Sequence, residues 1–257
     1  LGRGGSDTSA VAIAASIGSE RCDIYTDVSG IYTTDPRIKR KAAKLKKISF
    51  EEMLEMASLG ANVLQTRAVE MAMRSKTPIQ VLNSFSNEEG TLVCNEEEIM
   101  ERNMISGIAF QRNEARITLS NIEDKPGVAA KIFGPLADAG INVDMIVQSS
   151  TETGTTDLTF SCSAEDVEQA KEAIAQAKTL AYKNIIVNNE VAKVSIVGIG
   201  MKTHAGVAQK MFETLSEENI NIHVISTSEI KVSVLIERKY LELAVRSLHD
   251  AFELEKI

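Results

Sequence analysis

The first ten residues, LGRGGSDTSA, combine glycines, a cation and an acid in an order that suits the binding of an anion. Glycine lets the main chain approach a ligand closely, and the free N–H groups at the start of a helix attract phosphate or carboxylate. The apolar run 11–17 predicts that helix, and Ser6 and Asp7 are typical residues for its N-cap. A glycine turn that only caps a helix is the commoner case. We nevertheless expect an anion site, with Arg3 as its cation, because of the residues that follow downstream.

A second candidate site follows the short β-prone run CDIYT, which ends at Thr26. Ligands of open α/β sheets bind at the carboxyl ends of the strands, so Thr26 and Asp27 are expected to meet a nucleotide. The loop 32–37, YTTDPR, continues this site. Pro36 keeps the residue before it out of helical geometry, and Arg37 offers a planar fork that suits phosphate. Taken alone, either stretch is more often an ordinary turn.

Length, composition and charge limit the class of protein. The 257 residues suffice for roughly two domains, and an apolar content of 44% supports packed cores. The net charge of −8 argues against nucleic acid or a membrane surface as the partner, and no apolar run is long enough to span a membrane. Cys22, Cys94 and Cys162 lack CxxC spacing, which predicts buried thiols rather than disulfides or a zinc site. We expect a cytoplasmic protein without a metal site, and a solvated connection over the basic run 39–47.

The start of the chain is unusual in two respects. Leu1 takes the place of an initiator methionine, and no strand precedes the glycine-rich turn, although a phosphate-binding glycine loop normally follows one. We therefore expect the chain to be the C-terminal part of a longer protein.

The first hundred residues predict an α/β unit. Ser49 and Glu52 have the spacing of a capping box, and a helix with an apolar, methionine-containing stripe follows them. Gly60 interrupts the helical pattern. The remaining elements are a helix over 63–73, strands over 79–82 and 91–94, and a charged helical linker over 95–102.

Three linked motifs, LGRGGSDTSA, IYTDVSGIYTTDPR and SFEEMLEMASLGANVLQTRAVEMA, resemble the C-terminal half of the catalytic domain of aspartate kinases, in the amino-acid kinase superfamily. That family transfers the γ-phosphate of ATP to the side-chain carboxylate of L-aspartate and produces 4-phospho-L-aspartate. The resemblance implies part of a three-layer αβα fold, with MgATP as the cofactor. An aspartate side chain, with a pKa of about 3.9, is already an ionised nucleophile at neutral pH and needs no general base. The reaction needs instead cations, backbone N–H groups and Mg²⁺ around the transferred phosphoryl group.

The resemblance also assigns roles to single residues. Asn62 stands where many family members have a lysine, which puts one nucleotide contact in doubt. The family's N-terminal lysine-glycine motif and the rest of its substrate pocket are absent from the chain, so we expect no kinase activity from this chain alone. The implied aspartate-binding residues are Arg3, Gly4, Gly5, Ser6 and Asp7, and the implied ATP-binding residues are Thr26, Asp27, Tyr32, Thr33, Thr34, Asp35, Pro36, Arg37 and Asn62.

From Met104 onward, one pattern of elements occurs twice. The runs ARITL (115–119), GVAAKIF (127–133) and INV (141–143) return as AKVSI (192–196), GVAQKMF (206–212) and INI (220–222). A hairpin and a helix follow in each copy, over 145–161 and 164–177 in the first and over 223–236 and 239–252 in the second. The order β-α-β-β-α predicts two ferredoxin-like α+β units, each a sheet covered by two helices.

The two copies differ in the source of their fourth strand. The first copy completes itself with the run 184–187, whereas the second ends at Ile257 with too little chain for another strand. An unpaired strand edge is a liability, and the spare run ISGIAF (105–110) is the natural partner for it. We therefore expect the first copy to be inserted within the second. The expected units are 1–103, 104–188 and 189–257.

This pair of repeats resembles the tandem ACT domains of aspartate kinases, with IEDKPGVAAKIF and INVDMIVQ as the signature of the first. ACT domains bind free amino acids where the loop after the first strand meets the first helix, usually between two units. The helix N-terminus suits the α-carboxylate, and Asp124 or Asp144 suits the amino group. A glycine that only begins a helix is the alternative. The implied effector-binding residues are Asp124, Lys125, Gly127, Val128, Ala129, Asn142, Val143, Asp144, Gln148, Met201, Gly206, Val207, Asn221 and Ile222.

Two classes of function compete. The first is an aspartate kinase that is inhibited by lysine, threonine or both, and that forms a homodimer or higher oligomer through its ACT domains. The second is an amino-acid-sensing regulatory subunit that has no activity of its own and works with a kinase-bearing chain. The two phosphate-site stretches favour the first, because a pure sensor has no use for them. His204, His223 and His249 lack the spacing of metal ligands, and His204 is expected in a loop.

Overall fold

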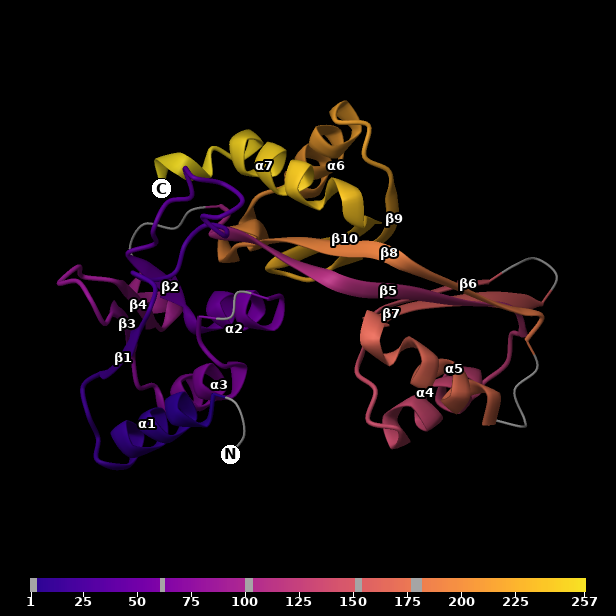
Figure 1. Cartoon of the computed structure of the whole chain (residues 1–257), viewed down its shortest axis with the longest axis horizontal. Helices are drawn as coiled ribbons and strands as arrows, with labels where there is room; N and C mark the ends of the chain where they lie inside the picture. Colours follow the sequence, from indigo (N-terminus) through magenta and orange to yellow (C-terminus); the bar gives the residue numbers. More distant parts are fainter. Residues whose placement is uncertain (1–3, 61–62, 100–103, 151–153, 177–181) are drawn as a thin grey trace.

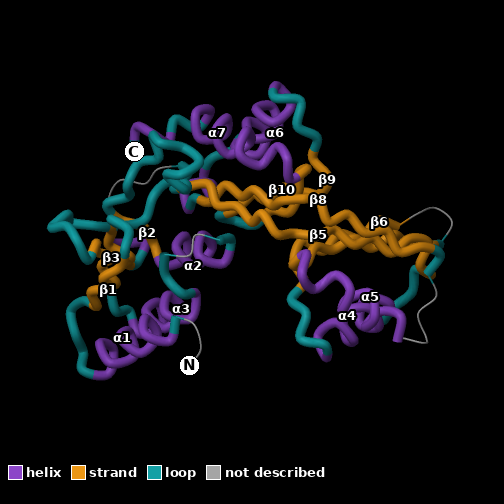
Figure 2. Tube along the Cα trace, viewed as in Figure 1, coloured by secondary structure: helices purple, strands orange, loops and turns teal. Residues whose placement is uncertain are grey.

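The computed structural model describes residues 4–60, 63–99, 104–150, 154–176 and 182–257. These residues form an elongated molecule, with an α/β unit at one end and two long strands that connect it to two pairs of helices (Figure 1). Figure 2 shows the strands as a continuous layer between these helix pairs. In the described parts of the chain, no helix is long and apolar enough to cross a membrane.

The N-terminal unit contains a four-stranded mixed sheet in the order β1-β3-β4-β2. Strand β1 (Cys22–Thr26) runs parallel to β3 (Ile79–Asn83), with Thr26 opposite Asn83, so their carboxyl ends meet at one edge. Strand β4 (Thr91–Cys94) is antiparallel to β3 and parallel to β2 (Lys47–Ser49). The helices of this unit are α1 (Gly5–Ser16), α2 (Phe50–Ser58) and α3 (Thr66–Ser75), and α3 packs against the other two.

The helix starts agree only in part with the sequence-based predictions. The Ser49–Glu52 capping box at α2 is confirmed. The N-cap predicted at Ser6 and Asp7 is wrong, because α1 begins earlier, at Gly5, with Gly4 as its N-cap. Gly4 has a φ of 74°, and a Cβ there would lie 1.9 Å from Cγ of Gln65, so only glycine fits.

The C-terminal part contains one six-stranded sheet in the order β6-β7-β5-β8-β10-β9. Its two central strands, β5 (Gly107–Glu123) and β8 (Asn184–Val197), are shared by both repeats. The start of β5 pairs with the end of β8, with Ile108 opposite Ile196, so the predicted pairing of 105–110 with the second repeat is confirmed. The other elements are β6 (Val143–Ser150), β7 (Thr155–Ser163), β9 (Ile222–Thr227), β10 (Lys231–Glu237), α4 (Val128–Asp138), α5 (Val167–Gln176), α6 (Val207–Glu217) and α7 (Leu241–Ala251).

The period of two along a strand explains why the helix pairs cover opposite faces of this sheet (Figure 1). In β8, the odd-numbered Ile185 and Val187 pack into the core beneath α4 and α5. The even-numbered Val194 and Ile196 pack into the core beneath α6 and α7. A single strand thus contributes to two cores. Short 3₁₀ turns complete the fold at Glu96–Glu98, Ala164–Asp166, Ile199–Thr203, Arg238–Tyr240 and Leu254–Lys256.

Buried polar contacts join the N-terminal unit to the second repeat. The carboxylate of Glu52, which is 3% exposed, accepts hydrogen bonds from Ser106 Oγ at 2.6 Å and from the main-chain N–H of Ile199 at 2.8 Å. The basic run 39–47 is exposed at Arg40, Lys41, Lys46 and Lys47, as predicted for a solvated connection, whereas Lys39 is mostly buried and pairs with Asp250. The helix predicted over 95–102 is limited to the 3₁₀ turn among the described residues, and 100–103 lie outside them.

The cysteines are buried, free thiols, as predicted. Burial raises the pKa of Cys94 and of Cys162 to about 11, so both are protonated at neutral pH. A neutral buried thiol behaves as a small apolar side chain.

Candidate nucleotide and effector sites

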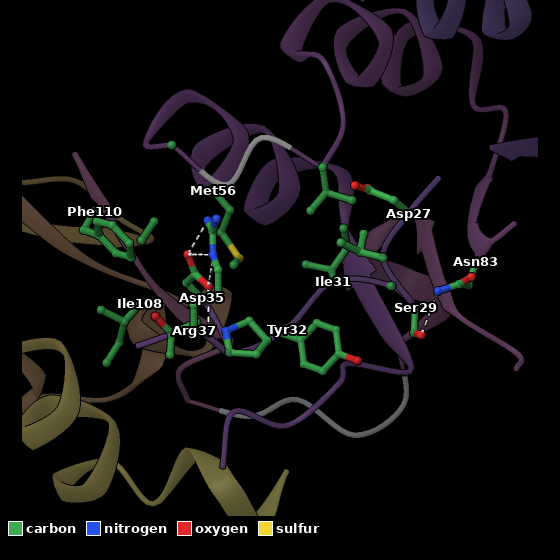
Figure 3. Close-up of a pocket in the computed structure, with 17 residues that line it drawn as sticks. Asp27, Ser29, Ile31, Tyr32, Asp35, Arg37, Met56, Asn83, Ile108 and Phe110 are labelled. Atoms are coloured by element: carbon green, nitrogen blue, oxygen red, sulfur yellow. Dashed lines mark hydrogen bonds and ion pairs between the residues drawn. The ribbon is translucent and has the colours of Figure 1, made fainter. Parts of the chain in front are cut away.

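A cavity of about 640 Å³ opens at the carboxyl ends of the parallel strands β1 and β3. This volume lies within the range of small-molecule sites. Asp27, Ser29 and Asn83 lie on one side of it, and Ile108 and Phe110, from β5, lie on the other (Figure 3). The cavity therefore lies between the N-terminal unit and the second repeat.

The polar side of the cavity follows directly from the strand order. Asp27 comes immediately after β1 and accepts a hydrogen bond from Thr26 Oγ1 at 3.1 Å. Asn83 ends β3, and its Nδ2 donates to Ser29 Oγ at 3.2 Å (Figure 3). Sequence reasoning missed Asn83. The only signal for it was its place at the carboxyl end of a second β-prone run.

The predicted loop 32–37 supplies a third side of the cavity, through Tyr32, Thr34, Asp35, Pro36 and Arg37. Arg37 Nη2 lies 2.8 Å from Asp35 Oδ2, and its Nε lies 3.1 Å from both carboxylate oxygens. Hydrogen bonding from Arg37 lowers the pKa of Asp35, which is therefore ionised at neutral pH. Thr34 Oγ1 is buried and has no hydrogen-bond partner within the described ranges.

Several predicted site residues lie elsewhere. Thr33 is fully buried and does not line the cavity, and its Oγ1 lies 3.0 Å from Nε2 of His249. Thr26 does not line the cavity, but its hydroxyl donates a hydrogen bond to Asp27, which does. Arg3 and Asn62 lie outside the described residues. The first turn of α1, with Gly4, Gly5, Ser6 and Asp7, does not line this cavity.

The two repeats begin their first helices in the same way. Gly127 is the N-cap of α4 with a φ of 91°, and Gly206 is the N-cap of α6 with a φ of 95°. A Cβ at either position would have no heavy atom within 4 Å, so both main chains are open to a ligand. Val128 and Val207, which follow them, are buried in the two cores and offer only their main chain to this site.

The predicted effector residues of the first repeat are divided between the two ends of α4. Asp124 and Lys125 precede the helix, as Gly127 does, whereas Asn142 and Asp144 follow it. A helix of 11 residues is about 16 Å long, so one amino acid cannot contact both ends within a single repeat. The other predicted residues are exposed (Ala129, Gln148, Asn221) or partly buried (Val143, Met201, Ile222).

Asp144 has an ionic partner in the structure. It contacts the ammonium group of Lys193, whose side chain is 3% exposed, and Lys193 Nζ also lies 3.9 Å from Glu114 Oε1. Although burial opposes it, the hydrogen bond from Lys193 lowers the pKa of Asp144. These groups line a second cavity, of about 470 Å³, beside the end of α2.

Comparison with known protein families assigns three parts of the chain. Residues 1–83 match the amino acid kinase family, and residues 117–179 and 194–252 match two descriptions of the ACT domain. An aspartate kinase of Stutzerimonas stutzeri is 57% identical over 99% of this chain, which corresponds to 62% of that relative. An aspartokinase of Pseudomonas aeruginosa is also 57% identical, over 99% of this chain and 63% of its own length.

Solved structures extend the comparison. The structure of the aspartokinase alpha and beta subunits is 51% identical, with a TM-score of 0.55, and the match covers 58% of this chain and 99% of that chain. The chain belongs to the aspartate kinase family. The aspartate kinase of Clostridium acetobutylicum matches 98% of this chain and 59% of its own, at 29% identity and a TM-score of 0.88. E. coli aspartokinase III in complex with aspartate and ADP matches 98% of this chain and 56% of its own, at 32% identity and a TM-score of 0.82. The chain thus spans less than two thirds of the aspartate kinases that it matches over its whole length.

Proposed function

We propose that this chain is part of an aspartate kinase, which transfers the γ-phosphoryl group of ATP to the side-chain carboxylate of L-aspartate. The observation that carries the proposal is the cavity at the carboxyl ends of β1 and β3, where the loop 32–37 meets Asp27 and Asn83. The related E. coli enzyme, which was crystallised with aspartate and ADP, supports this choice of ligands. A nucleotide in this cavity would contact both the N-terminal unit and β5 of the second repeat.

The chemistry asked of the protein is positioning and charge stabilisation. The aspartate carboxylate is the nucleophile and needs no general base. Arg3, with the first turn of α1, is proposed to hold the aspartate substrate. Mg²⁺ is proposed to arrive on the phosphates of ATP and to take a carboxylate such as Asp27 as a further ligand. Among the described residues, no group of three or more His, Cys, Asp or Glu side chains is placed to hold a metal ion.

The repeats are proposed to bind an amino acid effector, lysine or threonine. The open main chain at Gly127 and Gly206 supports this, because helix N-termini attract a carboxylate. Since Gly127 and Asp144 lie at opposite ends of α4, an effector that uses both sets of residues must lie between two facing units. We propose that two copies of the chain supply these facing units, in a homodimer or a higher oligomer. E. coli aspartokinase III has been crystallised with lysine and aspartate.

Asp27→Asn tests the nucleotide site, and Asp23→Asn, on the strand that precedes Asp27, is its matched control. Asp23 is exposed and pairs with Arg21 rather than with the cavity. Calorimetric titration of MgADP into the chain should show weaker binding for Asp27→Asn only. When the chain is joined to the N-terminal catalytic segment of its relatives, Asp27→Asn should raise the KM for ATP more than the KM for aspartate. Equal changes in both KM values would contradict the assignment. A wild-type chain that binds lysine or threonine but no nucleotide would instead favour the pure regulatory subunit.

A further inference from the structure

The loop 32–37, which lines the nucleotide cavity, is hydrogen-bonded to helix α7 through Thr33. His249, on α7, is completely buried, and its Nε2 lies 3.0 Å from Oγ1 of Thr33. The two residues are 216 positions apart in the sequence. Two ion pairs join the residues after this loop to the C-terminal residues. Lys39 pairs with Asp250, and Lys41 pairs with Glu255 at 2.9 Å.

Thr33 links the cavity to this contact. Tyr32 and Thr34, on either side of it, line the cavity, whereas Thr33 itself does not. Its main-chain N–H donates to the carbonyl of Ala43 at 2.9 Å, and its carbonyl accepts from the N–H of Ile108 at 2.7 Å. Its Oγ1 also accepts a hydrogen bond from the N–H of Ala43 at 3.0 Å. The main chain and side chain of Thr33 are therefore both fixed, and two of the groups that fix them, His249 and Ile108, come from the second repeat.

The state of the imidazole suits this role. Burial lowers the pKa of His249, so the ring is neutral at neutral pH and carries one donor and one acceptor nitrogen. Its Nδ1 is buried and has no hydrogen-bond partner in the ranges that the structure describes. The contact with Thr33 is thus the hydrogen bond that orients the ring.

We propose that His249 is a positioning residue for the nucleotide loop: by fixing Thr33, it holds Tyr32 and Thr34 at the cavity, so that the second repeat directly sets the affinity for nucleotide. This rests on the proposed nucleotide site. It gives the C-terminal helix a role that the sequence did not indicate, because His249 has no motif around it. A movement of α7 would shift Thr33 through its hydrogen bond to His249, and with it Tyr32 and Thr34 at the cavity.

The test uses the wild-type chain, four single variants and one double variant. His249→Leu removes the hydrogen bond, Thr33→Val removes it from the other side, and His249→Gln retains an amide nitrogen near the position of Nε2. Thr118→Val is the matched control, because Thr118 Oγ1 bonds to Thr159 Oγ1 at 2.9 Å in the first repeat, away from the cavity. Hydrogen exchange of the amides in 31–45 is measured without ligand, and the Kd for MgADP and the melting temperature are measured for each protein.

We expect amide exchange in 31–45 to accelerate about tenfold in His249→Leu and Thr33→Val, and the Kd for MgADP to rise about five- to tenfold. His249→Gln should stay close to wild type in both measurements. Thr118→Val should lower the melting temperature without changing the amide exchange in 31–45 or the Kd for MgADP. A double variant, His249→Leu with Thr33→Val, should lose no more affinity than Thr33→Val alone, because Thr33→Val already removes the bond to His249 together with the one from the N–H of Ala43.

The inference is overturned if His249→Leu lowers the melting temperature but leaves loop exchange or the Kd at the wild-type value. Should His249→Leu fail to fold, Thr33→Val decides the question, and an unchanged Kd for it overturns the inference equally. Failure of the proposed function is a separate result. If the wild-type chain does not bind MgADP, the nucleotide site itself is wrong; if it binds and His249→Leu binds equally well, only the role of His249 fails.

Discussion

Lys193→Met should be one of the most destabilising single changes at the junction of the two repeats. The Lys193 side chain is 3% exposed. Its substitution by methionine removes the ion pair with Asp144 and the contact with the carboxylate of Glu114, which lies 3.9 Å from Nζ. Removing one partner of a buried ion pair costs about 3–5 kcal/mol. We expect the lower end, about 3 kcal/mol, because Asp144 is half exposed and can be hydrated. For a chain of this size, that corresponds to a fall in melting temperature of roughly 6–12 °C.

The loss should also depend on pH. Burial raises the pKa of Glu114, an effect that Lys193 opposes. A raised pKa in the folded state gives stability that is present below the unfolded pKa and is lost as the pH rises through the folded pKa. In Lys193→Met the loss of stability with rising pH that comes from Glu114 becomes larger, because Lys193 no longer opposes the effect of burial. The stability that the protein gains from ionised Asp144, above the pKa of Asp144 in the unfolded chain, disappears. The difference from wild type should therefore be greatest at pH 7 and smaller at pH 4.5, where Glu114 takes up a proton, while the part that comes from Asp144 remains because its lowered pKa keeps it ionised there.

Urea denaturation at pH 7 and pH 4.5 measures both effects. Lys171→Met is the control, because Lys171 pairs with Glu168 on the surface at 3.0 Å and should lose only about 0.5 kcal/mol. Adding Glu114→Gln to Lys193→Met removes the uncompensated charge and should restore much of the stability at pH 7. A loss below about 1 kcal/mol at pH 7, or the same loss at both pH values, would refute this account of the junction.

Three further outcomes are expected. Gly90→Ala should lower the free energy of unfolding in urea by at least about 2 kcal/mol, because Gly90 has a φ of 68° and a Cβ there would lie 1.9 Å from the carbonyl oxygen of Val81. Gly18→Ala is the control: Gly18 has a φ of 65° but open space around it, so the loss should be only about 1 kcal/mol. Equal losses would show that the main chain at Val81 moves away from the new methyl group. Arg3→Ala should lower kcat/KM for aspartate about ten- to hundredfold once the whole catalytic domain is present, and an unchanged value would remove Arg3 from the substrate site. Asp144→Ala should abolish the rise in melting temperature of several degrees that saturating lysine or threonine gives the wild-type chain, and a rise of the same size in the variant would exclude Asp144 from the effector site.

Local pattern was sufficient for the repeat and for most of the strands, because both are encoded in neighbouring residues. It did not predict β2, and it gave β5 as two separate runs. The run CDIYT begins and ends where β1 does, and the spare run before the first repeat pairs with the second. Alternating apolar residues along β8 also carry the information that two cores lie on opposite faces. The N-cap of α1 was predicted wrongly because Gly4 takes a left-handed conformation, with a φ of 74°, directly before the helix, and Ser6 and Asp7 lie within the first turn.

Features that depend on the docking of distant elements could not be predicted. Asn83 reaches the cavity only because β3 lies beside β1 in parallel. His249 resembles any histidine on an amphipathic helix, and its burial follows from the packing of α7 against the loop that contains Thr33. The separation of Asp144 from Gly127 likewise follows from the length of α4, which places them at opposite ends.

NMR on the chain labelled at its threonine methyl groups tests whether the cavity at the ends of β1 and β3 binds a nucleotide. Thr34 lines the cavity, and Thr118 lies in the sheet of the first repeat, bonded to Thr159. On titration with MgADP, we expect the Thr34 signal to shift and to saturate while the Thr118 signal stays in place. A Thr34 signal that does not move at millimolar MgADP, or a saturable shift confined to the repeats, would contradict the account.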